Sequence, residues 1–202
     1  MSGTLTISLD GYTDLPPGKI ANVVTFVEMT APPPAAAPLP AGLAVVRVEH
    51  PTAAWYRGLY TRIGQRWLWF SRAVMSDTAL SALLASPAAE LHVLRRNGED
   101  IGMAELDRSE PGTVEIVSFG VVPEAVGTGA ARALMETVLA QVFAGGAKRV
   151  WLHTCSFDHP AAVPFYLKRG FRAFKFAIEV SDDPRRTGHL PKTAAPQIPL
   201  IE

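Results

Sequence analysis

The sequence predicts an α+β fold in which a mixed, mostly antiparallel sheet carries helices on both faces. Two observations point to this class. Two apolar strands flank Asn97-Gly98, which is the strongest signal for a tight turn between antiparallel strands. Farther along, a strand, a helix and another strand follow one another within residues 113–155, an order typical of a parallel crossover. A chain of 202 residues can bury a full core, so we expect one main domain.

Residues 1–42 are expected to form an N-terminal extension. Polar and apolar side chains alternate over residues 4–9, residues 22–29 are also predicted to be a strand, and the turn-rich segment between them predicts a hairpin. Residues 31–42 hold five prolines, which exclude a helix and an inner strand and predict an extended linker or strap. The extension completes the sheet, covers a pocket or forms a dimer contact, and these three alternatives stay open.

The main domain is expected to span residues 43–180. Its first half is predicted to contain a strand at 43–50, helices at 51–65 and 76–86, and two strands within 90–108. Pro51 suits the first turn of the first helix, because an N–H at that position has no intrahelical partner. Ser76 or Asp77 is expected to cap the second helix.

The second half of the main domain is predicted to contain strands at 113–122, 148–155 and 171–180, and helices at 128–144 and 160–169. Apolar residues from Leu134 to Phe143 recur at helical spacing, and Gly145-Gly146 ends that helix. Residues 181–202 carry four prolines and no periodicity, so a C-terminal loop or disordered tail is expected.

Charge and cysteine content narrow the class of protein. Lys and Arg together number 19, as do Asp and Glu, and this balance argues against a nucleic-acid groove or a membrane-surface protein. Cys155 is the single cysteine, which excludes an intramolecular disulfide and fits a reducing, cytoplasmic environment. We expect no signal peptide, because the N-terminus has no basic segment followed by an apolar run, and no membrane span, because no run approaches ~18 apolar residues. No cluster of His, Asp and Glu suggests a metal site.

Gly127 and Gly129 lie between the end of a strand and the start of a helix. The first amides of a helix have no intrahelical partner and carry a partial positive charge. Glycines let several such amides point at one spot, which predicts a phosphate cradle. The alternative is a tight turn in which the glycines merely relieve strain. The loop lacks the Gly-Lys-Ser/Thr end of a P-loop and the third glycine of a dinucleotide fingerprint.

Gly120 interrupts an apolar strand, and a glycine there often marks a bulge or the close approach of another backbone. A bulge would splay this strand from its parallel neighbour at 148–155. The gap would expose backbone N–H and C=O groups of Phe119 and Val121 to an amide-bearing chain. A ligand with a pyrophosphate at one end and a peptide-like arm at the other would suit both features, and coenzyme A is such a molecule.

The segment VVPEAVGTGAARALM, residues 121–135, with KRVWLHTCSFDHPAAVPFYLKRGF, residues 148–171, resembles the coenzyme-A-binding half of the GNAT acetyltransferase superfamily. Gly127 and Gly129 match the glycines of its loop motif, whereas Glu124 replaces the usual Gln or Arg and removes a cation near the phosphates. The later motif matches at Ala162, Tyr166, Gly170 and Phe171, with His159 where Asn is usual. The resemblance covers about residues 43–180 and implies the GNAT fold with a splayed parallel strand pair.

The resemblance implies an N-acetyltransferase that moves acetyl from acetyl-CoA, as co-substrate, directly to an amine of a small molecule or protein, without a metal. A non-catalytic acyl-CoA-binding or sensing relative is the alternative. Coenzyme contacts are expected from Phe119, Gly120, Val121, Val122, Gly127, Thr128, Gly129, Ala130, His159 and Ala162. The acceptor amine, the acyl-chain length of the donor and the oligomeric state, a homodimer included, stay open.

Tyr166 and Glu115 are the candidate catalytic residues. The resemblance implies that the backbone N–H near Val121 polarises the thioester carbonyl and that Tyr166 is the general acid for the departing thiolate, with a core tyrosine as the alternative. Glu115, whose half-buried position would raise its pKa, is the candidate base, against the alternative of a solvated carboxylate. Glu105 is the reserve, and a water chain without a single base is also open.

Four other residues with reactive or polar side chains lie close to these motifs. His153 and Cys155 lie two apart on a strand and form a conceivable nucleophile pair. The resemblance implies direct transfer, which needs no acyl-enzyme, so Cys155 is expected to pack in the interior. Asp158 or His159 is expected to cap the helix that follows Pro160.

Residues 55–72 are expected to line the acceptor pocket, as the corresponding region commonly does in the family. They hold four arginines among aromatic residues: Arg57, Arg62, Arg66 and Arg72. An anionic or aromatic acceptor, for example an amino-acid-like molecule, would suit such a wall. In the alternative, the aromatic residues are buried and the arginines are solvated around them.

Overall fold

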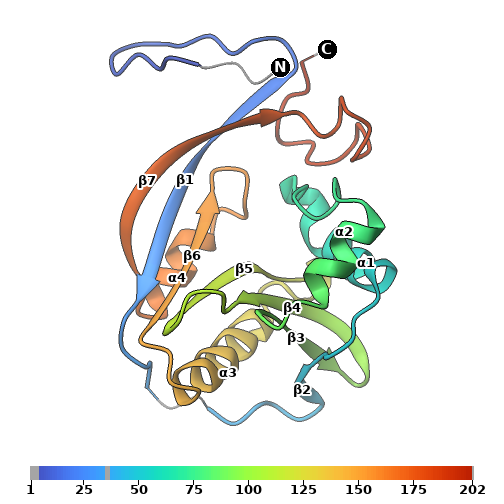
Figure 1. Cartoon of the computed structure of the whole chain (residues 1–202), viewed down its shortest axis with the longest axis vertical. Coiled ribbons are helices and arrows are strands. Elements are labelled where there is room, and N and C mark those ends of the chain that lie inside the picture. Colours follow the sequence, from blue (N-terminus) through green and yellow to red (C-terminus); the bar gives the residue numbers. More distant parts are fainter. Residues whose placement is uncertain (1–4, 35–36, 202) are drawn as a thin grey trace.

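The computed structural model describes residues 5–34 and 37–201 and contains a seven-stranded sheet with the strand order β2-β3-β4-β5-β6-β1-β7 (Figure 1). The strands are β1 Lys19–Met29, β2 Leu43–Arg47, β3 Ala89–Arg96, β4 Glu99–Asp107, β5 Thr113–Val121, β6 Arg149–Cys155 and β7 Arg172–Asp182. Among these described strands, only β5 and β6 are parallel neighbours, so the predicted α+β class with a mixed, mostly antiparallel sheet is confirmed.

Side-chain caps set the start of two of the described helices. The helices are α1 Ala53–Gly64, η1 Gln65–Trp67, α2 Asp77–Leu84, η2 Pro123–Ala125, α3 Ala130–Ala144 and α4 Ala162–Lys168. The Thr52 side chain accepts the amide of Trp55, so α1 starts after Pro51 rather than at it. Ser76, and not Asp77, caps α2, because its Oγ accepts the amide of Ala79.

The predicted hairpin in the N-terminal extension is wrong. Residues 5–9 form no strand, and β1 lies between β6 and β7, with Val24 opposite Cys155 on one side and Ala177 on the other. Val27, Glu28 and Met29 are consecutive and all buried, which requires cover on both faces and suits an inner strand. Of the alternatives for the extension, β1 therefore completes the sheet. Residues 1–4, 35–36 and 202 of the predicted extension, strap and tail lie outside the described residues.

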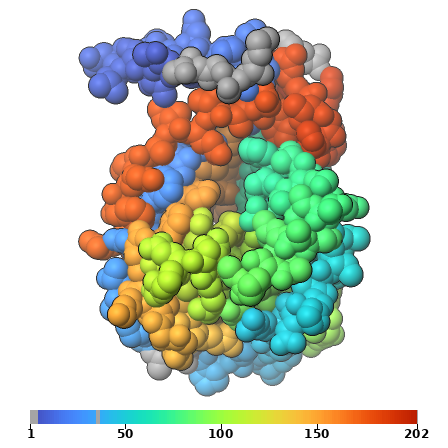
Figure 2. Space-filling model, in the orientation of Figure 1, coloured from blue at the N-terminus to red at the C-terminus, as the bar shows by residue number. Residues whose placement is uncertain are grey.

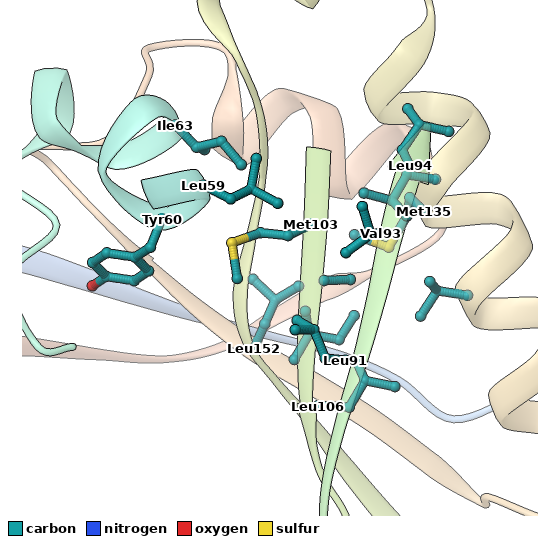
Figure 3. Close-up of a cluster of buried hydrophobic side chains, with 14 of the residues drawn as sticks. Leu59, Tyr60, Ile63, Leu91, Val93, Leu94, Met103, Leu106, Met135 and Leu152 are labelled. Carbon is teal, nitrogen blue, oxygen red and sulfur yellow. The ribbon is translucent and has the colours of Figure 1, made fainter. Parts of the chain in front are cut away.

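The core forms on both faces of the sheet. Figure 3 shows Leu59 and Ile63 of α1 reaching Met103 of β4 from one side, while Met135 of α3 packs beside Val93 and Leu94 of β3 from the other. All six belong to one cluster of buried apolar side chains. Burying such a side chain contributes about 1.5–3 kcal/mol, so this cluster fixes α1 and α3 on the sheet and with them the loops that flank β5.

The C-terminal segment, residues 183–201, contains no helix or strand, as predicted, yet it is ordered against the domain. Its Leu190, Ala194 and Ala195 form a second buried cluster with Leu68. The Arg185 side chain is only 1 % exposed and is paired with Asp183 at 2.7 Å. The tail therefore supports the loop after η1, which lies at the opening of the main pocket.

Candidate functional site

β5 and β6 diverge after a short paired stretch. Their parallel pairing ends at Glu115 opposite Trp151, so the rest of β5 faces a gap. The bulge that accompanies this divergence lies at Val117, since Glu105 pairs with Ser118 while Leu106 pairs with Ile116. The predicted bulge at Gly120 is therefore wrong.

Gly120 is glycine for a packing reason. A Cβ at this position would lie 2.5 Å from Ile63 Cγ2 and 3.2 Å from Trp69 Cη2, so any side chain would push α1 and Trp69 away from β5. The atoms that approach Gly120 belong to side chains and not to another backbone, so the second predicted reason for a glycine here is not met either. The side chains of α1 and of the following loop thus reach the edge of the gap.

Backbone groups of β5 point into the gap. The Val122 amide donates to Ile101 O of β4 at 2.9 Å. Successive amides of an extended strand point to opposite edges, so the amides of Val121 and Phe119 face the β6 side. These are the amides that the sequence predicted to be exposed by a splayed strand.

A pocket of about 360 Å³ occupies this gap. Its lining includes Gly127 before α3, Phe119 and Tyr166 beside the gap, and Asn22 and Glu179 on the β1–β7 ribbon, so it spans the divergence. Figure 2 shows the surface hollowed beneath this ribbon, between β6 and the α1–α2 side. Of the predicted coenzyme contacts, the following line it: Phe119, Gly120, Val121, Gly127, His159 and Ala162. Val122, Thr128, Gly129 and Ala130 are not among its lining residues.

The loop before α3 has the geometry of an anion cradle. Gly127 and Gly129 have φ of +77° and +85°, and a Cβ on either would meet no atom within 4 Å. Among the described residues, no backbone acceptor binds the amides of Gly127 and of residues 129–132, whereas the Thr128 amide donates to Ala125 O at 3.4 Å. Several amides at this helix start therefore keep their capacity to bind an anion.

Sequence reasoning missed a cation beside this loop. Arg96 Nη2 donates to Thr128 Oγ1 at 3.1 Å, and Thr128 in turn donates to Ala125 O at 2.8 Å. Arg96 precedes the Asn97-Gly98 turn, so its position depends on where the β3–β4 hairpin meets the loop, and no local pattern shows this. The Arg96 side chain places a positive charge near the loop in which Glu124 replaces the usual Gln or Arg.

Tyr166 lies in an aromatic setting at the pocket. Its ring has edge contacts with Phe119, Phe165 and Phe171 at centroid distances of 6.3, 5.4 and 5.9 Å. Within the described part of the chain, no group is hydrogen-bonded to its hydroxyl, and the residue lines the pocket. Burial, with the nearby charge of Asp158, raises the pKa of Tyr166 well above its ordinary value, so the hydroxyl keeps its proton at neutral pH.

Glu115 is half-buried, and the structure places it behind His153. His153 Nε2 is 4.0 Å from Glu115 Oε1, and His153 lines the pocket while Glu115 does not. Burial is the main cause that raises the pKa of Glu115; the charges of Asp107 and Glu105 add to it and Arg72 partly offsets it. Sequence reasoning considered His153 with Cys155, whereas the structure brings His153 to Glu115 across the β5–β6 pair.

Glu105 is committed to other contacts. Arg72 Nη2 donates to its Oε1 at 2.6 Å, Arg72 Nε donates at 3.1 Å, and the Tyr56 hydroxyl also donates to it. The carboxylate is buried and lies outside the lining of the main pocket. Its place ties α1 and the loop that follows η1 to β4, which makes it a structural anchor rather than an available base.

Cys155 and the polar residues after it have structural contacts. Burial, with the charge of Asp158, raises the pKa of the Cys155 thiol to about 11, so it is protonated at neutral pH. Asp158 accepts from Trp69 Nε1, Thr154 Oγ1 and the Cys155 amide. The Ala161 amide donates to His159 Nδ1 at 3.0 Å. Neither Asp158 nor His159 caps α4, so that prediction is wrong, and both hold the turn before it.

The acceptor side of the pocket differs from the expected cationic wall. Arg57 pairs with Asp77, Arg62 with Glu99 and Arg72 with Glu105, and none of the four arginines in residues 55–72 lines the pocket. The alternative of solvated arginines around buried aromatic residues holds only in part, because Arg72 is 15% exposed and paired, and because the aromatic residues line the pocket. The aromatic wall itself is present and consists of Tyr60, Trp67, Trp69 and Phe70. The carboxylates at the pocket are Asp158 and Glu179.

The described residues contain no group of three or more His, Cys, Asp or Glu side chains placed to hold a metal ion. Within the same ranges, no helix has the length and apolar character needed to cross a membrane.

Comparison with known proteins gives one family. The model of the acetyltransferase (GNAT) family matches residues 52–171, more than half of the chain. An uncharacterized N-acetyltransferase of Mycobacterium tuberculosis is 36% identical over 103 residues, which cover 51% of this chain and 65% of that protein. The match thus spans just under two thirds of that relative's length.

Solved structures show the same fold at low identity. A GCN5-related N-acetyltransferase of Sphaerobacter thermophilus has a TM-score of 0.63 at 18% identity, over 80% of this chain and 52% of that chain. One from Kribbella flavida has a TM-score of 0.54 at 19% identity, over 82% of this chain and 60% of that chain.

Proposed function

Because the chain belongs to the acetyltransferase (GNAT) family, we propose that it transfers acetyl from acetyl-CoA directly to an amine of a small molecule or protein. The observation that carries the proposal is one pocket that joins an open amide cradle before α3 to a strand gap holding the Val121 amide and Tyr166. A non-catalytic coenzyme-binding relative would share the cradle, so the test must separate binding from turnover.

The residues present fit coenzyme A as a co-substrate. The free amides of Gly127 and of residues 129–132, with Arg96 beside them, would hold the phosphates. The backbone N–H and C=O of Phe119 would pair with the peptide-like arm, as an added strand does, which leaves the Val121 N–H for the thioester carbonyl. Gly120, His159 and Ala162, which line the pocket, would shape the same channel. Acetyl-CoA, when bound, supplies the acetyl thioester.

Three groups around the gap would each assist one part of acetyl transfer. The Val121 N–H would polarise the thioester carbonyl. His153 faces the pocket and would take the proton of the acceptor ammonium, with Glu115 behind it to stabilise the positive charge. The Tyr166 hydroxyl, which stays protonated because burial raises its pKa, would give its proton to the departing sulfur.

The acceptor is a cation before it reacts, and the pocket suits one. Among the residues that the structure describes, its lining has two carboxylates, Asp158 and Glu179, no lysine or arginine, and an aromatic wall. Asp158 already accepts three hydrogen bonds from the protein, which leaves Glu179 as the carboxylate with spare capacity. We therefore infer an amine on an apolar or aromatic body, rather than an anionic acceptor.

The proposal is tested by coenzyme binding and by thiol release with a panel of amines. CoA at about 100 times its Kd should stabilise the fold by about 2.7 kcal/mol. Gly129→Asp should weaken CoA binding about a hundredfold, because it adds strain at positive φ and a negative charge in the phosphate cradle. Calorimetric titration gives the Kd.

Gly146→Asp is the matched control, since Gly146 has φ of +90° and lies beyond the opposite end of α3. It should strain the fold and leave the Kd for CoA unchanged. An equal increase of the Kd for CoA in both variants, or no CoA binding by the wild type, would refute the phosphate cradle. Binding without thiol release across the panel would instead support the non-catalytic alternative.

The pH profile tests Glu115. The carboxylate must be ionised to assist His153, and its raised pKa places the acid limb of kcat/KM at higher pH than an ordinary glutamate would. Activity therefore falls as pH decreases through that pKa. Glu115→Gln should lower kcat/KM about 10- to 100-fold and should change the pH at which this limb falls, because the carboxylate no longer assists His153.

His153→Gln should cause a similar loss, and the double variant should lose little more than either single one, because the two residues act as a unit. Cys155→Ser is the control at the same pocket and should keep the acid limb at the same pH. An acid limb at the same pH in Glu115→Gln as in the wild type would contradict the assignment.

A further inference from the structure

The outer edge of β7 is open. β7 is the last strand of the sheet, and no strand within residues 5–34 and 37–201 pairs with its far side, which Figure 1 shows at the margin of the molecule. It is eleven residues long, whereas edge strands in monomers are usually short or covered. Its unpaired backbone groups are a template for another strand.

One face of the β1–β7 ribbon is apolar and exposed. Phe176, Ile178 and Val180 alternate along β7 and are 71%, 50% and 37% exposed, and Val23, opposite Ile178 on β1, is 52% exposed. These four side chains share one face of the β1–β7 ribbon because strand side chains alternate. An exposed apolar stripe along an open edge indicates a surface that a partner covers.

The sequence of β7 is complementary to itself in one antiparallel register. When two copies are centred on Ala177, Phe176 lies opposite Ile178 of the partner subunit, and Lys175 lies opposite Glu179 of the partner subunit. Two-fold symmetry repeats each pair, which gives two apolar and two oppositely charged pairs. The register shift between Phe26 and Val27 places Phe174 in a bulge, which ends the regular pairing there.

The two charges are already held on one face. Lys175 Nζ lies 3.8 Å from the centroid of the Phe26 ring, and Glu179 Oε2 accepts from Asn22 Nδ2 at 2.9 Å. Both side chains are thus positioned before pairing. We propose that a second copy of this chain pairs antiparallel with β7, centred on Ala177, and that the two sheets become continuous across a two-fold axis.

Charge reversal tests the pairing by sedimentation equilibrium of the full chain. The wild type should be a dimer, while Lys175→Glu and Glu179→Lys should each weaken dimerisation at least tenfold, because each places like charges opposite one another twice. The double variant should restore the dimer. Lys148→Glu, an exposed reversal away from β7, is the control and should leave the dimer intact.

Cross-linking tests the register in a Cys155→Ser background. Residues directly opposite each other in an antiparallel pair are close enough for a disulfide, so Ala177→Cys should form a covalent dimer on oxidation. Ala173→Cys is the matched control, because in this register the two copies of position 173 lie about 26 Å apart. A monomeric wild type, a dimer indifferent to both reversals, or equal cross-linking of both cysteines would overturn the proposal.

Discussion

Tyr166→Phe is expected to lower kcat about a hundredfold or more while the Kd for CoA stays within about twofold. The substitution removes one oxygen and keeps the ring, so the aromatic contacts with Phe119, Phe165 and Phe171 remain. What is lost is the proton that burial keeps on the hydroxyl at neutral pH. Steady-state kinetics and coenzyme titration measure the two quantities.

The acid role and a packing role give different results with a changed leaving group. An acetyl donor with a more acidic thiol needs less help from an acid, so the loss in Tyr166→Phe should shrink with that donor. Tyr60→Phe is the matched control, because Tyr60 also lines the pocket and its hydroxyl is engaged with Ser71 at 3.1 Å. A loss in Tyr166→Phe that is the same for both donors would leave only the packing role.

Arg185→Ala is expected to lower the free energy of unfolding by about 3–5 kcal/mol, because it leaves the buried Asp183 charge without its partner. Arg185 also donates to Ile198 O at 2.7 Å and to Pro199 O at 3.3 Å, so it holds the far end of the tail to its beginning. The tail packs on Leu68, so the acceptor KM should rise while the Kd for CoA changes little. Denaturant unfolding and kinetics measure these effects.

Arg186→Ala is the control, since Arg186 is exposed and its side chain donates to Ile201 O at 3.2 Å. It should cost less than about 0.5 kcal/mol. If Arg186→Ala is as destabilising as Arg185→Ala, the buried pair does not hold the tail.

The Asp183–Arg185 pair also makes the stability of the C-terminal tail depend on pH. Burial alone would raise the pKa of Asp183, yet the hydrogen bonds and charge of Arg185 lower it overall. A lowered pKa in the folded state means that the stabilisation is present above the unfolded-state pKa and is lost as pH falls through the folded-state value.

Local patterns predicted most of the elements. The Asn97-Gly98 turn, the Ser76 cap and the helical spacing from Leu134 to Phe143 depend on neighbours in the sequence, and the structure has the corresponding hairpin and helices. The glycine loop was also visible, because a strand, two glycines and a helix start lie in one short segment. The catalytic roles of Tyr166 and Glu115 stay predictions.

Features that depend on distant contacts could not be predicted. The place of β1 depends on two strands more than a hundred residues away, and a periodic pattern does not tell an inner strand from one half of a hairpin. The bulge at Val117 is set by the β4 register, and Gly120 by the approach of Ile63 and Trp69. Arg96 reaches the loop, and Glu115 meets His153, only because separate strands pair side by side.

The position of β1 between β6 and β7 has a consequence for how the protein is made. On the ribosome, β1 emerges early, but the slot it fills exists only after β7, which ends at Asp182, has been synthesised. Its other neighbour, β6, ends at Cys155, so β1 has no strand to pair with until that point, and such unpaired apolar segments attract chaperones or misassemble. We therefore expect β1 to stay unpaired for most of translation. The sheet is completed in a late step, when β1 takes its place between β6 and β7.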